Sequence, residues 1–365
     1  MESEFFGTER ISRILMRLAP PVMLAQLIQA LYNIVDSFFV GRFSDTGLTA
    51  LSIVYPLQLL MIALAVGTGV GINTAMAYFL GTRDRKRSDE AAGISTALSL
   101  VMWAVFALLA AVLMPAYARM STESEAVIAD VIVYGRIVCV CSIGLFLESG
   151  WTKVLQAEGN MNRPMAAQIL GAVTNIVLDP LLIFGIGPFP QLGMRGAALA
   201  TILSQLLSAI WILRFLTSDK TILKLRRSSM RLSARRVRKI VGLGLSGFTM
   251  AITNCTVQIM CNATLQVYGG DLYVGVMTVI NSIREIATLP VTGVTHSAQP
   301  VLGFNYGAKE YGRVKKAIVF TSFIAILYTT GIWLIVDGFP AFFIRIFNQD
   351  AELIAAGIPA IRLYF

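Results

Sequence analysis

The feature that most constrains this chain is its series of long apolar stretches, the first of which is Pro20–Val40. Each stretch is long enough to cross the roughly 30 Å hydrocarbon core of a bilayer as an α-helix. Inside hydrocarbon, backbone N–H and C=O groups must bond to one another within the segment, which a helix achieves. The sequence therefore predicts an all-α polytopic membrane protein.

Composition agrees with this fold class and excludes several functional classes. The 365 residues are 56% hydrophobic and only 14% charged, whereas soluble domains carry about 25% charged residues. The net charge of +9 does not indicate a nucleic-acid partner, because the basic residues stand between apolar stretches, where they act as topology signals. GxxxxGK[ST], HExxH and GxSxG are all absent. We therefore expect no enzymatic activity, no cofactor and no use of ATP.

Nine apolar spans and the start of a tenth set the expected topology. The spans cover 16–41, 48–80, 92–118, 130–154, 164–187, 196–216, 240–268, 272–304 and 315–344, and the tenth begins near 351. With the N-terminus inside, cytoplasmic segments carry Arg10, Arg13, Arg17, Arg83, Arg85, Lys86, Arg87, Lys153, Arg163, the basic run from Lys220 to Lys239, Lys309, Arg313, Lys315 and Lys316. The opposite segments carry only Arg42, Arg119, Arg195 and Arg345. Because Lys and Arg are retained in cytoplasmic loops, we expect a cell-membrane protein with a cytoplasmic N-terminus.

The two halves of the chain resemble each other. A shift of 226 residues places Gly81 on Gly307, each followed by a basic segment. Six spans precede the polar linker, so both halves have the same orientation and are expected to be related by a pseudo-two-fold axis along the membrane normal. We predict an N-terminal six-helix bundle (1–216), a basic cytoplasmic linker (217–239) that either contacts lipid or is merely solvated, and a partial C-terminal bundle (240–365). In this interpretation the second bundle, helices 7–9 and the start of 10, is incomplete, as in a truncated product.

The first span contains one acidic residue, Asp36. Placing a carboxylate in the middle of a bilayer costs roughly 2.5 kcal/mol or more, so such a residue usually faces protein or water and has a function. Gln29, Tyr32 and Asp36 share one helical face through their spacing. We predict that this face binds a proton or cation. The alternative is that Asp36 forms structural hydrogen bonds between helices.

The fifth span carries a second polar pair, Asn175 and Asp179, spaced to point the same way. Pro180 follows, and a proline inside a helix frees a backbone carbonyl. If Asp36 and Asp179 lie in neighbouring helices, they can share one proton, because two like charges close together disfavour double ionisation. A Na⁺ ion held by Asp36, Asn175 and Asp179 is the other possibility, and a hydrogen-bonded structural cluster is the third.

The second half carries polar residues without an obvious charge partner. Asn254, Gln258 and Asn262 form a stripe at helical spacing, and Arg284 and Glu285 stand deep in the eighth span; all five are candidates for a substrate cleft. The stripe could equally be structural, since inter-helix hydrogen bonds in membranes contribute roughly 0.6 kcal/mol each. Arg136, Glu148 and Asp337 are expected near the membrane interfaces, with their polar ends in water. His296 is expected to be a packed polar residue.

Several motifs together resemble the multidrug and toxic-compound extrusion (MATE) family. They are QALYNIVDSFFVG, LTALSIVYP, GTGVGINTAMAYFLGTRD, LQAEGNMNRPM, N-x3-DP-x4-G, GMRGAALATILSQ and QPVLGFNYGAKEYGRVKKA, spread over the chain from Gln29 to Ala317. An acidic first helix with an Asn/Asp pair in the fifth is similar to the DinF-like branch. The seventh span lacks the acidic residue that another branch of the family carries there.

This resemblance implies two six-helix bundles that rock around a central cleft. It also implies a cation-binding network at Asp36, Gln29, Tyr32, Asn175, Asp179 and Thr201. The expected function is a monomeric antiporter that exports amphipathic, often cationic, compounds in exchange for H⁺ or Na⁺. A flippase or exporter of a lipid-linked precursor or polysaccharide, from the same superfamily, is the alternative.

Overall fold

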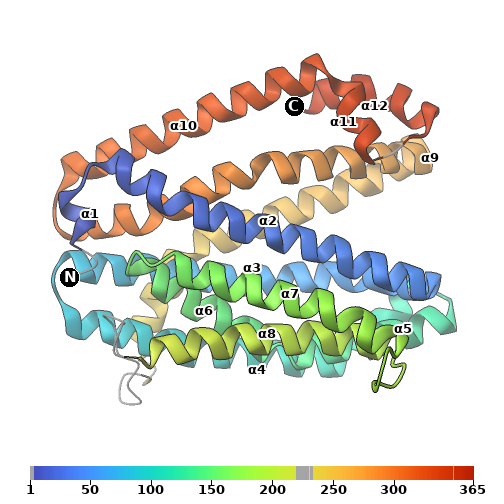
Figure 1. The fold of residues 1–365 in the computed structure, drawn as a ribbon, viewed down its shortest axis with the longest axis horizontal. Coiled ribbons are helices and arrows are strands. Elements are labelled where there is room, and N and C mark those ends of the chain that lie inside the picture. Colours follow the sequence, from blue (N-terminus) through green and yellow to red (C-terminus); the bar gives the residue numbers. More distant parts are fainter. Residues whose placement is uncertain (1–3, 219–229, 231–232, 348) are drawn as a thin grey trace.

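The computed structural model describes residues 4–218, 230, 233–347 and 349–365, apart from the side chains at 45, 255, 259, 262, 263, 266 and 271. Within these residues the regular structure is entirely helical (Figure 1). The helices are α1 (Phe5–Thr8), α2 (Ile11–Phe43), α3 (Asp45–Gly81), α4 (Arg85–Ser121), α5 (Glu125–Val140), α6 (Ile143–Ala157), α7 (Asn162–Phe184), α8 (Met194–Leu216), α9 (Ala234–Gly307), α10 (Tyr311–Gly338), α11 (Pro340–Phe347) and α12 (Ala351–Tyr364). The predicted all-α fold class is confirmed.

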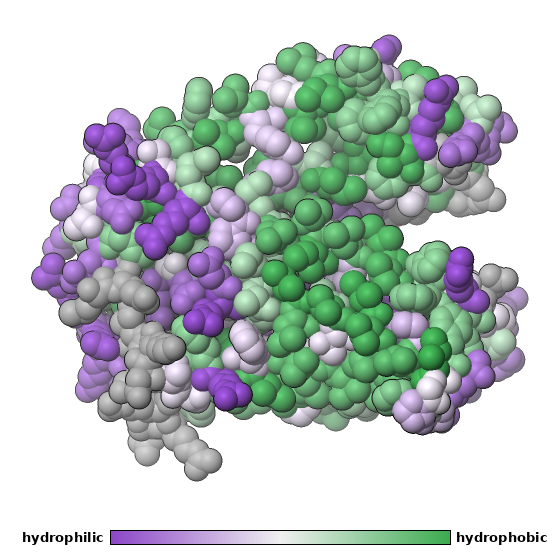
Figure 2. Space-filling view, viewed as in Figure 1, coloured by the Kyte–Doolittle hydropathy of each residue, from purple (hydrophilic) through white to green (hydrophobic). Residues whose placement is uncertain are grey.

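The long helices are those expected of a membrane protein. In the described residues, eight helical segments are long and apolar enough to cross a bilayer, and the bent pair α5 and α6 makes a ninth span if counted together. Figure 2 shows apolar side chains over the middle of the molecule and hydrophilic side chains gathered at its two ends. This distribution is that of a multi-pass membrane protein, because only the ends meet water and headgroups.

Two predicted spans, the fourth and the ninth, differ from the helices observed. The fourth, predicted as 130–154, is two helices bent by 40° between Val140 and Ile143. The seventh and eighth spans, predicted as 240–268 and 272–304, match the two parts of α9, which is kinked between them where Gly270 takes a φ of 63°, a left-handed value that favours glycine. The ninth ends at Gly338, and α11 starts at Pro340, because a proline disfavours helical geometry at the residue before it.

The first long helix also starts earlier than expected. The first span was predicted to begin at 16, but α2 begins at Ile11, so that Pro20 and Pro21 lie well inside it. A proline inside a helix removes one backbone hydrogen bond and favours a kink. The prolines therefore lie within the helix, between its polar start and Asp36.

Two groups of helices form the molecule. We call α2–α8 the N-terminal bundle and α9–α12 the C-terminal bundle. In Figure 1 the C-terminal helices α10–α12 lie along one edge, α3–α8 lie at the other, and α2 runs between them. Figure 2 shows a cleft between the two groups that opens toward the end where α2 stops and α9 is kinked. The bundles meet at the opposite end.

Backbone contacts between α3 and α9 close that opposite end. A side chain at Gly81 would collide with the carbonyl of Phe304, and one at Gly307 would collide with the carbonyl of Tyr78. The 226-residue shift places Gly81 on Gly307 and Tyr78 on Phe304. The same close contact is therefore made twice, once from each half, as a two-fold relation between the halves requires.

The short helix α1 is anchored to the C-terminal bundle at the same end. Arg313 donates from Nη2 to the carbonyls of Phe6 (2.8 Å) and Glu9 (2.6 Å), and from Nε to Oδ1 of Asn305 (2.9 Å). Asn305 is fully buried and donates to the Phe6 carbonyl at 3.0 Å. The α1 segment is thus fixed by charge-assisted hydrogen bonds, which are stronger than neutral ones.

We expect Arg313→Ala to release α1. The substitution removes three hydrogen bonds from a charged donor, although the Phe6 carbonyl keeps its bond from Asn305. Loss of a hydrogen bond from a charged group destabilises by about 1.5–3 kcal/mol. Amide hydrogen exchange at residues 5–9 should become faster, and Lys316→Ala, at an exposed site on the same helix, should leave it unchanged. Equal exchange in the two variants would contradict the anchoring role.

Candidate functional site

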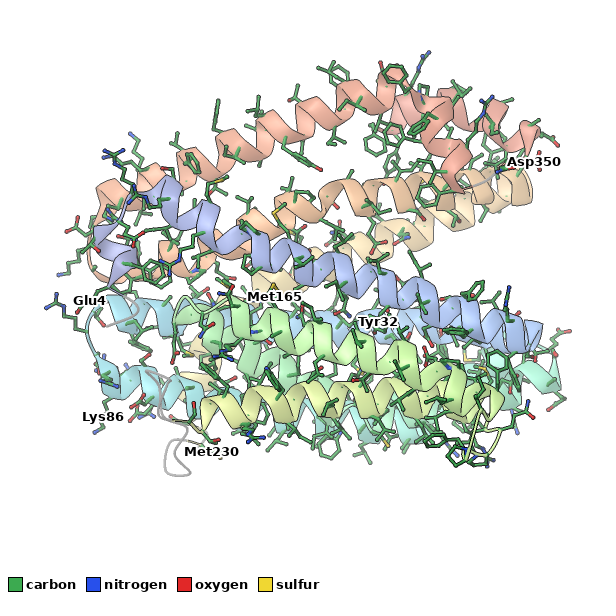
Figure 3. The ribbon with its side chains drawn as sticks, viewed as in Figure 1. Glu4, Tyr32, Lys86, Met165, Met230 and Asp350 are labelled. Atoms are coloured by element: carbon green, nitrogen blue, oxygen red, sulfur yellow. The ribbon has the colours of Figure 1, made fainter. Side chains whose placement is uncertain are left out.

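A cavity of about 810 Å³ lies mainly within the N-terminal bundle. Its walls come from α2, α3, α5, α6, α7 and α8, with three residues from α9. Met165 and Tyr32, both lining residues, lie along the seam between α7 and α2 (Figure 3). The lining includes Gln26, Gln29, Asn33, Asp36, Gln58, Tyr134, Glu148, Lys153, Gln156, Gln168, Thr201, Gln205, Glu285 and His296. The cavity is therefore polar and carries charges of both signs.

The first charged group is the pair Asp36 and Asp179. Asp36 lines the cavity from α2 and is 8% exposed, whereas Asp179 on α7 is fully buried. The two carboxyls are close enough to repel each other electrostatically. The structure thus brings together two acidic residues from helices that are far apart in sequence. This is the arrangement in which two carboxyls hold one proton or share one cation.

Asn175 completes this group. It is 1% exposed, and its Nδ2 donates to Oδ1 of Asp179 at 3.2 Å, as their spacing on α7 predicts. Three buried oxygens, Asp36 Oδ1, Asn175 Oδ1 and Asp179 Oδ2, accept no hydrogen bond from a described residue. Oxygens left in this way suit a proton on a carboxyl or a hard cation such as Na⁺. The described residues contain no cluster of three or more His, Cys, Asp or Glu side chains that would hold a transition metal.

Pro180 adds a backbone group next to these oxygens. It stands inside α7, and because proline has no N–H, the carbonyl four residues earlier, at Ile176, lacks its helical donor. Ile176 directly follows Asn175. The local sequence therefore removes the usual helical donor from one main-chain oxygen in the part of α7 that carries Asn175 and Asp179.

The other predicted members of the network lie around the cavity. Tyr32, Gln29 and Thr201 all line it. Thr201 is 4% exposed, and its hydroxyl donates to the Ala197 carbonyl at 3.1 Å. The hydroxyl oxygen thus keeps its acceptor capacity toward the cavity.

Tyr134 on α5 is a residue that the sequence alone did not indicate. It is 1% exposed, lines the cavity and interacts electrostatically with Asp36. Gln58 of α3 donates to its hydroxyl at 3.4 Å. A lone tyrosine in an apolar span carries no distinguishing signal, because its role depends on α5 packing beside α3.

Three further charged or titratable residues line the cavity, and two of them, Glu148 and Lys153, are placed differently from the prediction. Glu148 was expected near an interface, but it lines the cavity and accepts a hydrogen bond from Thr152 at 3.1 Å. Lys153 was counted as a topology signal in a cytoplasmic loop, but it stands inside α6, is 5% exposed and lines the same cavity. His296 of α9 lines the cavity as well and interacts electrostatically with Lys153. These groups form a second charged region.

The candidate cleft residues of the second half are dispersed. Of the four whose side chains are described, Glu285 is the one that lines the cavity. Asn254 is exposed, Gln258 is half-buried, and Arg284 is half-buried with a buried Nε that has no partner among described residues. The side chain of Asn262 lies outside the described residues. Helical spacing put the stripe on one face of α9 without fixing what that face meets.

The comparison with protein families settles the class of this chain. A family model described as MatE matches residues 21–181 and 246–365, which is most of the chain. The chain belongs to the MATE family. The predicted family is confirmed, and the DinF-like branch stays a prediction.

Relatives of this MATE chain carry transporter names. The FAD transporter of Shewanella oneidensis is 22% identical over 94% of this chain and 76% of that protein. The probable multidrug resistance protein NorM of Thermotoga maritima is 26% identical over 94% and 74%. The multidrug export protein MepA of Staphylococcus aureus is 21% identical over 86% and 68%. Membership of this family makes the chain a multi-pass membrane transporter of small molecules.

Solved structures give the same fold. The outward-facing conformation of a multidrug resistance MATE family transporter matches with a TM-score of 0.91 at 25% identity, covering 99% of this chain and 80% of that chain. A MOP superfamily transporter from Pyrococcus furiosus matches with the same TM-score and coverage at 24% identity. The arrangement of the bundles is therefore that of known MATE transporters.

Proposed function

We propose that this MATE chain is a secondary active antiporter that exports amphipathic, often cationic, drugs and toxic compounds in exchange for H⁺ or Na⁺. The observation that supports coupling is the group of three unpartnered buried oxygens on Asp36, Asn175 and Asp179, next to a large polar cavity. The multidrug names of relatives support export of small molecules over the alternative, a lipid-linked precursor or polysaccharide. We propose the coupling ion as the one co-substrate, with no enzymatic step, no ATP and no nucleic acid.

The proposed cycle depends on competition at the cavity. A proton or Na⁺ entering from the outer side neutralises the pair Asp36 and Asp179, which weakens the attraction for a cationic compound. Because α2 contains Pro20 and Pro21, it can bend there when its contacts with α7 change. A ligand shifts a conformational equilibrium only through different affinities for the two states. Cation binding and drug binding must therefore favour opposite states of α2.

An efflux assay with imposed gradients tests this function. Full-length protein reconstituted in proteoliposomes should drive efflux of a fluorescent cation when a pH gradient or a Na⁺ gradient is imposed, and not without one. A channel would conduct without counter-transport, and an enzyme would change the compound chemically. Efflux that ignores both gradients would contradict the antiporter proposal.

The proposed orientation places the cleft on the outer side of the cell membrane and the linker 217–239 on the inner side. Most of that linker, including Ser229, lies outside the described residues. Phe189, in the loop between α7 and α8, is 40% exposed. The protein is proposed to act as a monomer in contact with membrane lipid.

Cysteine labelling checks the orientation. In a cysteine-free background, needed because Cys141 is exposed, Phe189→Cys should react with an impermeant maleimide on intact cells. Ser229→Cys should react only after the membrane is permeabilised, because basic segments stay in the cytoplasm. Labelling of Ser229→Cys on intact cells would invert the proposed topology.

A further inference from the structure

The proposed coupling mechanism uses Asp36, Asn175 and Asp179. It assigns no role to the second charged region of the cavity, which contains Glu148, Lys153 and His296. Lys153 lines the cavity from α6 and is 5% exposed. The lysine head makes no hydrogen bond or ion pair with a described residue. A buried ammonium is costly unless it is paired. An anionic group that enters the cavity would therefore be expected to pair with the Lys153 ammonium.

Contacts with α3 build the position of Lys153. A side chain at Gly69 would come within 2.7 Å of Cγ of Lys153, so the glycine makes room for the lysine stem. Asn73, which is 1% exposed, donates from Nδ2 to the Lys153 carbonyl at 3.0 Å. Contacts with α3 therefore fix both the side chain and the main chain of Lys153. Lys153 therefore lines the cavity from a packed helix, and it is not a surface lysine on a loop.

Glu148 is the nearest acidic candidate for pairing, but it does not form an ion pair with Lys153. The two interact electrostatically, and Oε1 of Glu148 accepts from the Thr152 hydroxyl at 3.1 Å. They stand five residues apart on α6, which is about 7.5 Å along the helix axis. Glu148 and Lys153 therefore present a negative and a positive group to different parts of the same cavity.

The other neighbours of Lys153 in the lining do not supply an anion. Gln156 lies three residues further along α6, and His296 interacts electrostatically with Lys153; both line the cavity, and neither carries a negative charge. An acidic substrate group placed at Lys153 would meet an ammonium and amide groups, whereas a cationic group would meet Glu148 and the Asp36 end.

We propose that Lys153 binds an acidic group of the exported compound, so that this transporter takes amphipathic zwitterions, with the cationic part toward Glu148. This inference rests on the proposed export function and names its substrate class. A cavity with charges of both signs would bind zwitterions better than simple cations, whereas a cavity with negative charge alone would select organic cations.

A matched pair of dyes tests the inference. Rhodamine 110 carries a free carboxylate beside its cationic ring system, and rhodamine 123 is the methyl ester of the same molecule. Binding to purified full-length protein is measured by fluorescence anisotropy at one pH. Lys153→Gln should weaken rhodamine 110 binding by about tenfold or more, because a hydrogen bond to a charged group is lost. Rhodamine 123 binding should change less than about twofold by the same reasoning.

Further variants separate a binding role from a packing role. Lys153→Arg should keep the preference for rhodamine 110, because it keeps the charge, and Lys316→Gln, at an exposed site, should change neither dye. Glu148→Gln should weaken rhodamine 123 at least as much as rhodamine 110, and this variant leaves Lys153 in place. It therefore keeps the test open even if Lys153→Gln fails to fold.

Each other outcome overturns the inference. An equal loss for both dyes in Lys153→Gln would make Lys153 a packing residue, and no loss would make it a bystander. Failure of both dyes to bind the wild-type protein would also count against a zwitterion site. None of these results bears on the proposed antiport. That proposal is tested separately, by gradient-driven efflux of a fluorescent cation.

Discussion

Asp36→Asn is expected to give a folded, membrane-inserted protein that has lost gradient-driven efflux. Asn has nearly the same shape as Asp, so the packing of α2 against α7 should persist, but an amide cannot take up a proton. If the coupling ion is Na⁺, the substitution removes a charged oxygen ligand that hard cations prefer, and Na⁺ dependence should disappear. Efflux of a fluorescent cation should fall to the level of protein-free liposomes.

Controls for this prediction come from the same chain. Asp130→Asn removes a carboxylate on α5 that accepts from Thr46 at 3.0 Å and does not line the central cavity. Asn262→Ala changes the residue that the 226-residue shift places on Asp36. Both should retain efflux at equal membrane abundance, because neither removes a titratable group from the cavity. Wild-type rates from Asp36→Asn together with an inactive Asn262→Ala would place the coupling site in the other bundle.

Gly81→Val is expected to force the two bundles apart at their closed end. The new side chain would collide with the Phe304 carbonyl, which belongs to the backbone and cannot rotate away. Overpacking of this kind destabilises by about 1–3 kcal/mol, and by more where backbone must shift. The melting temperature in detergent should fall, and efflux should fall with it, because the state in which this end is closed is one of the two states of the proposed transport cycle.

Two more glycine variants make this prediction specific. Gly307→Val should reproduce the effect, since it makes the symmetry-related contact with Tyr78. Gly312→Val is the matched control, because nothing lies within 4 Å of a side chain there. Wild-type melting and efflux in Gly81→Val would mean that α3 and α9 do not close on each other as described.

The sequence by itself determined the features that depend on neighbours along one helix. Hydropathy alone predicted most spans, because a bilayer requires a minimum apolar length. The pair Asn175 and Asp179 followed from spacing of four residues, and the structure shows their hydrogen bond of 3.2 Å. Asp36 stood out because an acidic residue in an apolar span needs a partner or a function. These inferences required no knowledge of which helices meet.

Only the tertiary structure decided which residues share the cavity. Lys153 precedes the connection between α6 and α7, and Arg163 follows it in the first turn of α7. The charge pattern therefore counted Lys153 as a cytoplasmic signal, whereas it packs against Gly69 and Asn73 of α3 and is buried. His296 reaches the same cavity from α9. The sequence does not show how deeply a charged side chain is buried or which way it points, because both depend on which helices pack around it. Local periodicity thus gave the acidic pair, and the packing of distant helices gave the cavity its basic side.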